Sequence, residues 1–203
     1  ISLPGAHANE RHIQREAIGQ GRKVFESRRG ASSHQMNSFI AVLEHNADEF
    51  SGEVYGFDLV YSGNHSFEIE KDQFEQTRVV AGINDYNFSW HLEAGESFQA
   101  PEVLLAFSAN GLNEMSQNYH ELIREHIVRG KFKHKEREIL VNNWEATYFE
   151  FNEDKLKTIV DDAKELGIEM FVLDDGWFGE RSSDRAGLGD WKANLKRLPG
   201  GIA

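Results

Sequence analysis

The sequence predicts a chain in two parts, an antiparallel β-sandwich followed by an α/β unit. In the first part, short segments of alternating apolar and polar residues recur about every ten residues, a spacing typical of antiparallel sandwiches. From residue 137 onward, an apolar strand, a loop, an amphipathic helix and a second apolar strand follow one another. This order indicates one βαβ unit, whose two strands must be parallel.

Five segments of the first part are predicted as strands. Each is rich in β-branched or aromatic residues and is bounded by turn-forming residues such as glycine and asparagine. The segments are 52–61, 65–70, 77–80, 86–92 and 103–107. We therefore expect a β-sandwich domain over residues 1–110.

From residue 112 onward, the apolar residues follow the spacing of a helix and no longer the alternation of a strand. Apolar residues recur at positions 112, 115, 119, 122, 123 and 127. Gly130 follows as a helix stop, and residues 131–137 are basic. Residues 111–136 are therefore predicted to be a linking helix and a connector to the α/β unit.

The α/β unit is predicted from a strand at 137–141 and a well-defined helix. Asn152 can cap this helix, and two acidic residues in the first turn suit the positive end of its dipole. The predicted apolar face consists of Leu156, Ile159, Val160, Ala163 and Leu166. Gly167 is expected to end the helix.

Polar and aromatic residues follow the two strands of this unit. The loops 142–148 and 174–191 both come after the carboxyl ends of strands, the edge where ligands bind in barrels and open α/β sheets. The second loop begins with Asp174 and Asp175 and continues to Trp177. Carboxylates bind hydroxyl groups strongly, and an indole offers a flat apolar surface to a sugar ring. This pattern favours a sugar site, although an ordinary strand-to-turn junction has a similar composition.

Composition narrows the possible partners. The net charge of −12 over 203 residues argues against nucleic acid and anionic membrane surfaces, and favours a neutral or weakly charged substrate. No cysteine is present, so a thiolate nucleophile or thiolate metal site is absent. No histidine lies at ligand spacing near Asp174 and Asp175, and we expect neither a metal nor a cofactor. The chain begins at Ile1 and carries no signal-peptide pattern or apolar run of membrane-spanning length, which is compatible with a cytoplasmic location.

Several longer motifs resemble the microbial α-galactosidases of glycoside hydrolase family 36. They are Leu3-Pro-Gly-Ala-His-Ala-Asn-Glu-Arg-His12, Arg29-Gly-Ala-Ser-Ser-His-Gln35, Gly52-Glu-Val-Tyr-Gly-Phe57, Asn142-Asn-Trp-Glu-Ala-Thr-Tyr-Phe149, Leu173-Asp-Asp-Gly-Trp-Phe-Gly179, Leu188-Gly-Asp-Trp191 and Leu198-Pro-Gly-Gly201. The resemblance implies a β-supersandwich followed by a catalytic (β/α)8 TIM barrel. It also implies retaining hydrolysis of terminal α-1,6-linked galactose in melibiose, raffinose and stachyose.

The same resemblance implies that the chain is an internal fragment. Residues 1–110 correspond to the C-terminal part of the sandwich, and residues 137–203 to the first β/α units of the barrel. Retaining glycosidases need a nucleophile and an acid/base, and both are expected beyond Ala203. The fragment alone is therefore expected to be inactive, whereas the intact enzyme is expected to be a homo-oligomer, a tetramer in many relatives.

The resemblance also assigns substrate-binding residues. Asp174 and Asp175 correspond to aspartates that bind galactose O4 and O6, and Trp144 to a wall of the pocket. His7 corresponds to a position at the substrate entrance that is often tryptophan in relatives. Trp177 and Trp191 are further candidates, for which packing explains the indole equally well. Adjacent strand residues point to opposite faces, so Asp174 and Asp175 are not expected to be the catalytic pair.

Other functions stay open at this point. The chain could belong to a galactose-binding module or pseudoenzyme without catalysis, or to an α-galactosyl transferase such as the raffinose and stachyose synthases. His12 and His34, with Glu10, Arg11 and Arg15, could form a separate site on the β domain. A polar network that ties this domain to the barrel explains these five residues equally well.

Overall fold

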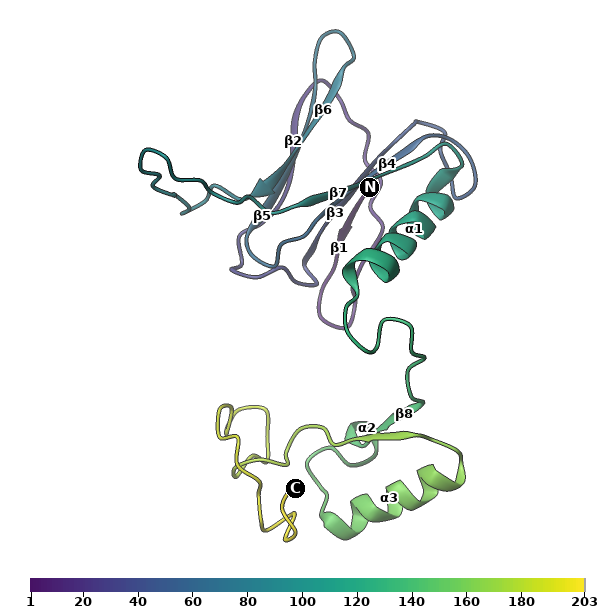
Figure 1. Cartoon of the computed structure of the whole chain (residues 1–203), viewed down its shortest axis with the longest axis vertical. Coiled ribbons are helices and arrows are strands. Elements are labelled where there is room, and N and C mark those ends of the chain that lie inside the picture. Colours follow the sequence, from purple (N-terminus) through teal and green to yellow (C-terminus); the bar gives the residue numbers. More distant parts are fainter. Residues whose placement is uncertain (203) are drawn as a thin grey trace. The chain divides into compact units, whose positions relative to one another are not determined.

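The structure is a computed structural model that describes residues 1–202, and the chain divides into two compact units. The first unit is Ile1–Val128, and the second begins at Arg129. Figure 1 shows strands and one long helix in the first unit, and two helices with two short strands in the second. Each unit has a hydrophobic core of its own.

Two antiparallel sheets form the first unit. The four-stranded sheet has the order β1 (Ser2–Pro4), β3 (Met36–Leu43), β4 (Val54–Leu59), β7 (Val103–Ser108), and the three-stranded sheet has the order β2 (Gly21–Ser27), β5 (His65–Lys71), β6 (Thr77–Ile83). Ile40 and Leu59 of the first sheet share a buried cluster with Phe67 and Ile69 of the second. The sheets therefore pack face to face, in the sandwich-like arrangement predicted for this part of the chain.

The helix α1 (Gly111–Leu122) covers the other face of the four-stranded sheet, against β4 and β7 (Figure 1). Its buried Met115 and Tyr119 join a second core with Ala41, Ala47 and Val54. Gly56 allows this close approach, because a Cβ atom there would lie 2.7 Å from the Tyr119 ring. The Tyr119 hydroxyl donates to the Leu104 carbonyl at 3.0 Å. A π-helical turn, η1 (Ile123–Ile127), continues α1, so the predicted helical stretch is confirmed.

Four of the five strand predictions in the first part are confirmed. The predicted segments 52–61, 65–70, 77–80 and 103–107 correspond to β4, β5, β6 and β7. Three strands, β1, β2 and β3, were not predicted. Successive residues of β3, which pairs with β4, point to opposite faces of the four-stranded sheet. Ile40 faces the core between the two sheets, and its neighbour Ala41 faces α1.

The predicted strand 86–92 is wrong. No strand is present there, and Asn87 has a φ angle of 53°, which lies outside the extended region. Phe88 and Trp90 instead pack against Phe98, with ring centroids 6.1 and 4.9 Å apart. The alternating pattern thus comes from a local aromatic cluster on an irregular segment, in which Trp90 stays 61% exposed.

The second unit contains the predicted βαβ order. Strands β8 (Leu140–Asn142) and β9 (Met170–Val172) are parallel, with Val141 paired to Phe171. The short helix α2 (Trp144–Thr147) and the helix α3 (Glu153–Glu165) lie between them in the chain. The described residues form a two-stranded sheet here and do not close a barrel. A core of Phe151, Leu156 and Leu198, with Phe171, Leu173 and Trp177 packed on it, supports the sheet.

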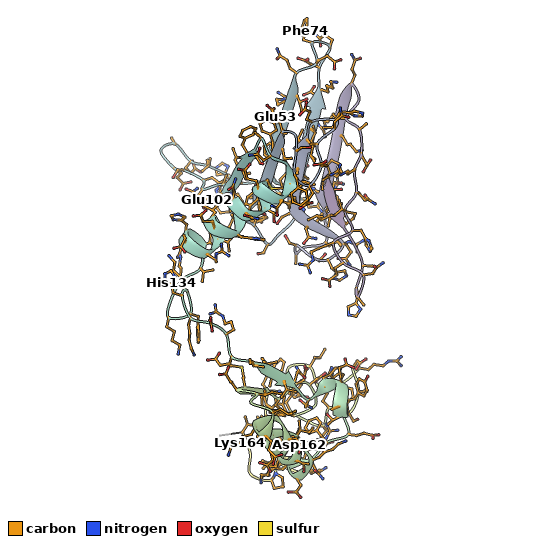
Figure 2. All side chains as sticks on the ribbon, turned by 90° about the vertical axis from the view of Figure 1, so that its right-hand side faces the viewer. Glu53, Phe74, Glu102, His134, Asp162 and Lys164 are labelled. Carbon is orange, nitrogen blue, oxygen red and sulfur yellow. The ribbon has the colours of Figure 1, made fainter. Side chains whose placement is uncertain are left out.

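The helix α3 begins and ends as predicted. Asn152 caps it, since its side-chain oxygen accepts the Lys155 N–H at 2.9 Å. Of the predicted apolar face, Leu156 and Ala163 are buried, whereas Val160 is 38% and Leu166 is 79% exposed, so these two do not belong to the buried face. Gly167 follows with a positive φ angle of 77°. Figure 2 shows Asp162 and Lys164 on this helix. Among residues 1–202, no helix has the length and apolar character needed to cross a membrane.

Candidate functional site

The candidate site begins where the two parallel strands end. Asn142 is the last residue of β8, and Asp174 follows β9 by two positions. The Asn142 amide donates to Oδ2 of Asp174 at 2.6 Å, and its amide oxygen accepts the backbone N–H of Trp144 at 2.7 Å. Parallel strands bring their carboxyl ends to one edge. The edge therefore presents the Asp174 carboxylate and the Asn142 amide, which are hydrogen-bonded to each other.

Asn143 fixes this edge from inside the unit. It is fully buried, and its side-chain oxygen accepts the backbone N–H of Asp174 at 2.8 Å. Its side-chain NH2 donates to the Thr147 hydroxyl, also at 2.8 Å, while its backbone N–H donates to the Val172 carbonyl. A buried amide with its bonding groups satisfied holds its neighbours firmly. Asn143 thereby positions the backbone that carries Asp174.

Asp175 is held by a different set of contacts. Its Oδ1 accepts from Nε of Arg181 at 2.5 Å and from the backbone N–H of Gly176 at 2.6 Å. The hydrogen bond from Arg181 lowers the pKa of the Asp175 carboxyl below its usual range, and the same pairing raises the pKa of Arg181. Asp175 is therefore an anion at neutral pH.

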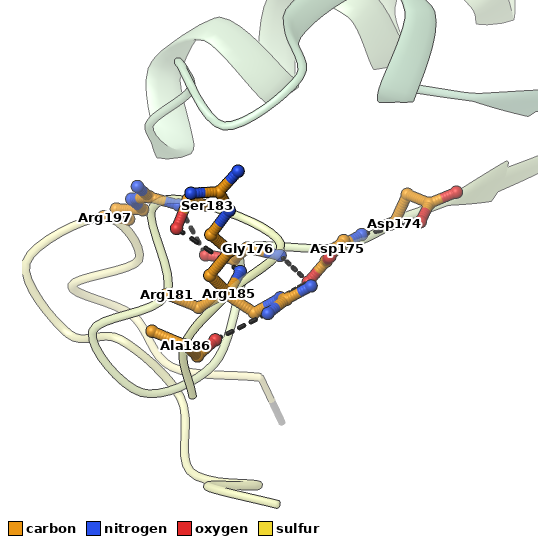
Figure 3. A network of polar contacts seen from close by, with 8 residues as sticks. All are labelled: Asp174, Asp175, Gly176, Arg181, Ser183, Arg185, Ala186 and Arg197. Atoms are coloured by element: carbon orange, nitrogen blue, oxygen red, sulfur yellow. Dashed lines mark hydrogen bonds and ion pairs between the residues drawn. The ribbon is translucent and has the colours of Figure 1, made fainter. Parts of the chain in front are cut away.

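The two aspartates point in different directions. Figure 3 shows the Asp174 side chain at the edge of the polar network, where its Oδ1 accepts the backbone N–H of Asp175 at 2.7 Å, while the Asp175 carboxylate turns towards Arg181. Each carboxylate has its own partner, Asn142 for the first and Arg181 for the second. The two carboxylates are therefore separate hydrogen-bond acceptors, each oriented by its own partner.

Trp144 starts the short helix α2 beside this edge. Its ring makes edge-to-face contacts with Tyr148 and Phe149, with centroids 5.3 and 4.9 Å apart. The side chain is half-buried, and its backbone is tied to Asn142. One aromatic surface thus lies next to the polar strand ends.

Trp177 and Trp191 belong to an aromatic group in the second loop. Their ring centroids are 6.4 Å apart, and Phe178 contacts both at 5.1 and 4.6 Å. Trp177 also packs on the core of the unit, whereas Trp191 is 64% exposed. Of the two indoles, Trp191 has the greater surface available to a ligand.

His7 lies in the first unit, on an exposed turn. The turn is closed by backbone bonds between Ala6 and Asn9, and the His7 ring meets the His34 ring edge to face at 6.2 Å. His12 contacts Asn9. Arg15 donates to a backbone carbonyl of the same unit.

Two protein-family models match the chain. Melibiase matches residues 97–203, and the glycosyl hydrolase family 36 N-terminal domain matches residues 1–93. Together they account for nearly every residue. The chain belongs to glycosyl hydrolase family 36.

Relatives in family 36 resemble the chain along its whole length. Alpha-galactosidase Mel36A of Lactobacillus acidophilus is 65% identical over 202 residues, which are 100% of this chain and 28% of that protein. The crystal structure of alpha-galactosidase AgaA from Geobacillus stearothermophilus is 58% identical, with a TM-score of 0.95 over 99% of this chain and 28% of its own. Variants of AgaA have been solved in complex with stachyose and with raffinose. The chain thus spans little more than a quarter of the length of these relatives.

Within this family 36 chain, the second unit contains five of the six predicted site residues. Asp174, Asp175 and Trp144 are linked directly or through Asn142, whereas Trp177 and Trp191 form the aromatic group described above. The remaining one, His7, belongs to the first unit. Among residues 1–202, no three His, Asp or Glu side chains gather as a metal-binding group.

Sequence reasoning missed three residues that shape the site, Asn142, Asn143 and Arg181. Asn143 lies inside a quoted motif, and its place after a strand was a usable signal. Arg181 lies in the loop after Trp177 and gave no signal, because an arginine in a polar loop usually faces solvent.

Proposed function

We propose that this chain is part of a retaining α-galactosidase that hydrolyses terminal α-1,6-linked galactose in melibiose, raffinose and stachyose. The observation that carries the proposal is a pair of divergent carboxylates at the carboxyl ends of parallel strands, in a chain of family 36. The stachyose and raffinose complexes of AgaA, 58% identical over this region, support the choice of substrate.

In this proposal the five residues of the second unit form part of the galactose pocket. Asp174 and Asp175 accept hydrogen bonds from O4 and O6 at the far end of the sugar ring. Trp144 supplies an apolar wall, and Trp177 and Trp191 line the same region. The bonds that Asn142 and Arg181 make to the carboxylates support these roles, because a prearranged acceptor loses little entropy on binding. His7 is proposed to lie at the substrate entrance.

The proposal extends to domain organisation. Residues 1–110 are the C-terminal part of a β-supersandwich, 111–136 a linking helix and connector, and 137–203 the first β/α units of a (β/α)8 barrel. The parallel pair β8 and β9, with a helix between them, supports the barrel. Nucleophile and acid/base, which lie roughly 5–5.5 Å apart in a retaining enzyme, are then supplied by later strands. We also propose that the intact enzyme is a cytoplasmic tetramer.

Kinetics of the full-length enzyme test this function. We expect release of nitrophenol from 4-nitrophenyl α-galactoside and none from the β-anomer. Proton NMR of the first product should show α-galactose before mutarotation, as retention requires. Galactose binding without turnover would favour a binding module. Transfer of galactose to sucrose in preference to water would favour a transferase.

A further inference from the structure

Arg181 is a buried cation in the loop that follows the two aspartates. The residue is only 5% exposed. Its Nε donates to Asp175, and its Nη1 donates to the Ala186 carbonyl at 2.5 Å (Figure 3). The guanidinium lies 5.7 and 5.8 Å from the ring centroids of Phe149 and Phe178. A buried charge needs such partners, so these contacts define its position closely.

The contact with Asp175 is directional. Arg181 and the backbone N–H of Gly176 both bond to Oδ1, and neither of them uses Oδ2. The carboxylate is therefore anchored through one oxygen, with 23% of its side chain exposed. An anchored carboxylate presents its second oxygen in one direction.

We propose that Arg181 is a positioning residue for galactose recognition, which holds Asp175 so that Oδ2 meets a sugar hydroxyl. The inference rests on the proposed function of Asp175 in galactose binding. Arg181 acts through this carboxylate and does not contact the sugar itself.

The same side chain organises the loop after it. Its bond to Ala186 closes the turn, and Gly187 packs directly on it, since a Cβ atom at Gly187 would lie 3.1 Å from the Arg181 Cβ. Gly187 has a positive φ angle of 78°, which suits glycine. The loop therefore folds around Arg181, the same side chain that holds Asp175.

The charges around Asp175 set the pH range in which the test is informative. Arg181 is the main cause of the lowered pKa of Asp175. Asp174 accepts the backbone N–H of Asp175, Asp184 acts on Arg181, and Arg197 donates to the Gly176 carbonyl. Loss of the guanidinium removes the nearest positive charge, so Asp175 would protonate at a higher pH.

The test uses galactose as the probe and the full-length enzyme as the protein. Galactose affinity is measured by calorimetry for the wild type, Arg181→Met, Arg181→Lys and the control Arg185→Met. Arg185 is exposed in the same loop, so the control removes the same charge without the buried contacts. We expect Arg181→Met to weaken binding about tenfold or more, Arg181→Lys to recover part of the loss, and Arg185→Met to bind normally.

A double-mutant cycle separates positioning from a general structural role. If Arg181 acts through Asp175, then Arg181→Met costs little further affinity in an Asp175→Asn background. In the Arg181→Met variant, galactose affinity measured against pH should also begin to fall at a higher pH on the acidic side than in the wild type. The proposal would be overturned if the two substitutions lowered galactose affinity additively and the acidic limb of the pH profile stayed at its wild-type position. Should Arg181→Met fail to fold, the same cycle and pH profile with Arg181→Lys decide the question.

The outcomes also separate the two proposals. A wild-type enzyme that binds no galactose would contradict the proposed function, and the role of Arg181 with it. If the wild type and Arg181→Met bind galactose equally well at every pH, only the role of Arg181 is overturned.

Discussion

Asn142 donates its side-chain amide to Asp174 across 2.6 Å and accepts the backbone N–H of Trp144 with its amide oxygen. A single side chain at the end of β8 thus orients a carboxylate after β9 and begins the helix that carries an indole. The polar and aromatic parts of the candidate site are therefore coupled before any ligand arrives. The predictions for the intact enzyme begin with these residues.

Substitution of either aspartate should impair the enzyme severely. We expect Asp174→Ala or Asp175→Ala to lower kcat/KM for an α-galactoside by about 10²-fold or more, because a charged hydrogen bond is worth up to ~3 kcal/mol. Inhibition by free galactose should weaken as well. Asp161→Ala, an exposed change on α3, is the matched control. Near-normal kinetics in both site variants would show that the two aspartates do not belong to the galactose pocket.

The indole of Trp144 should matter for binding more than for folding. It is half-buried, so Trp144→Ala should weaken galactose inhibition while the melting temperature falls only slightly. Trp90→Ala in the first unit is the control, because it removes an indole that is 61% exposed and lies outside the candidate site. Loss of the folded enzyme in Trp144→Ala would instead identify a core residue.

The pair of Asp175 and Arg181 should stabilise the fold in a defined pH range. The folded pKa of Asp175 is lowered relative to about 3.9 in the unfolded chain. The stability gained is therefore present above about pH 4 and is lost as the pH falls through the folded pKa. We expect the melting temperatures of wild type and Asp175→Asn to differ by a constant amount from about pH 5 to 8, and to converge below about pH 4. Convergence already near pH 6 would contradict the assignment.

Gly56 should resist even the smallest side chain. A Cβ atom there would lie 2.7 Å from the Tyr119 ring and 3.0 Å from Met115, inside the core under α1. We expect Gly56→Ala to lower the free energy of unfolding by about 1–3 kcal/mol. Gly82→Ala in β6 is the control, since no atom lies within 4 Å of its Cβ position. Calorimetric unfolding of the two variants compares the sites, and equal stability would contradict the packing argument.

The 203-residue chain expressed alone should not hydrolyse α-galactosides. The proposed nucleophile and acid/base lie beyond Ala203, and the sheet of β8 and β9 leaves Leu140 and Met170 exposed. We expect no nitrophenol from 4-nitrophenyl α-galactoside and a tendency of the second unit to aggregate. Turnover by the purified chain, free of host enzyme, would show that the catalytic residues are placed wrongly.

Local patterns predicted most of the individual elements. The helix α3 could be predicted because Asn152, its acidic first turn and Gly167 each act within a few residues. The strand prediction for segment 86–92 was wrong because the aromatic residues that pack on Phe98 alternate in sequence as they would in a strand. Strand pairing depends on distant partners, and the short strand β1 pairs with β3, more than thirty positions away in the chain.

The candidate site was predictable in part. Asp174 and Asp175 could be proposed because they follow an apolar strand, at the edge where ligands bind in α/β folds. Their partners could not be found, since the contact between Asn142 and Asp174 spans 32 positions, and Arg181 is buried only because the loop folds back on Asp175. The direction of each carboxylate is thus a tertiary property.

The exposed Trp90 gives the chain a useful spectroscopic asymmetry. It is the one tryptophan of the first unit, whereas Trp144, Trp177 and Trp191 all belong to the second. A Trp90→Phe variant of this chain would therefore fluoresce only from the second unit when excited at the red edge of indole absorption. Its emission would report selectively on the second unit, for example when further barrel segments are supplied to it, without a contribution from the first unit.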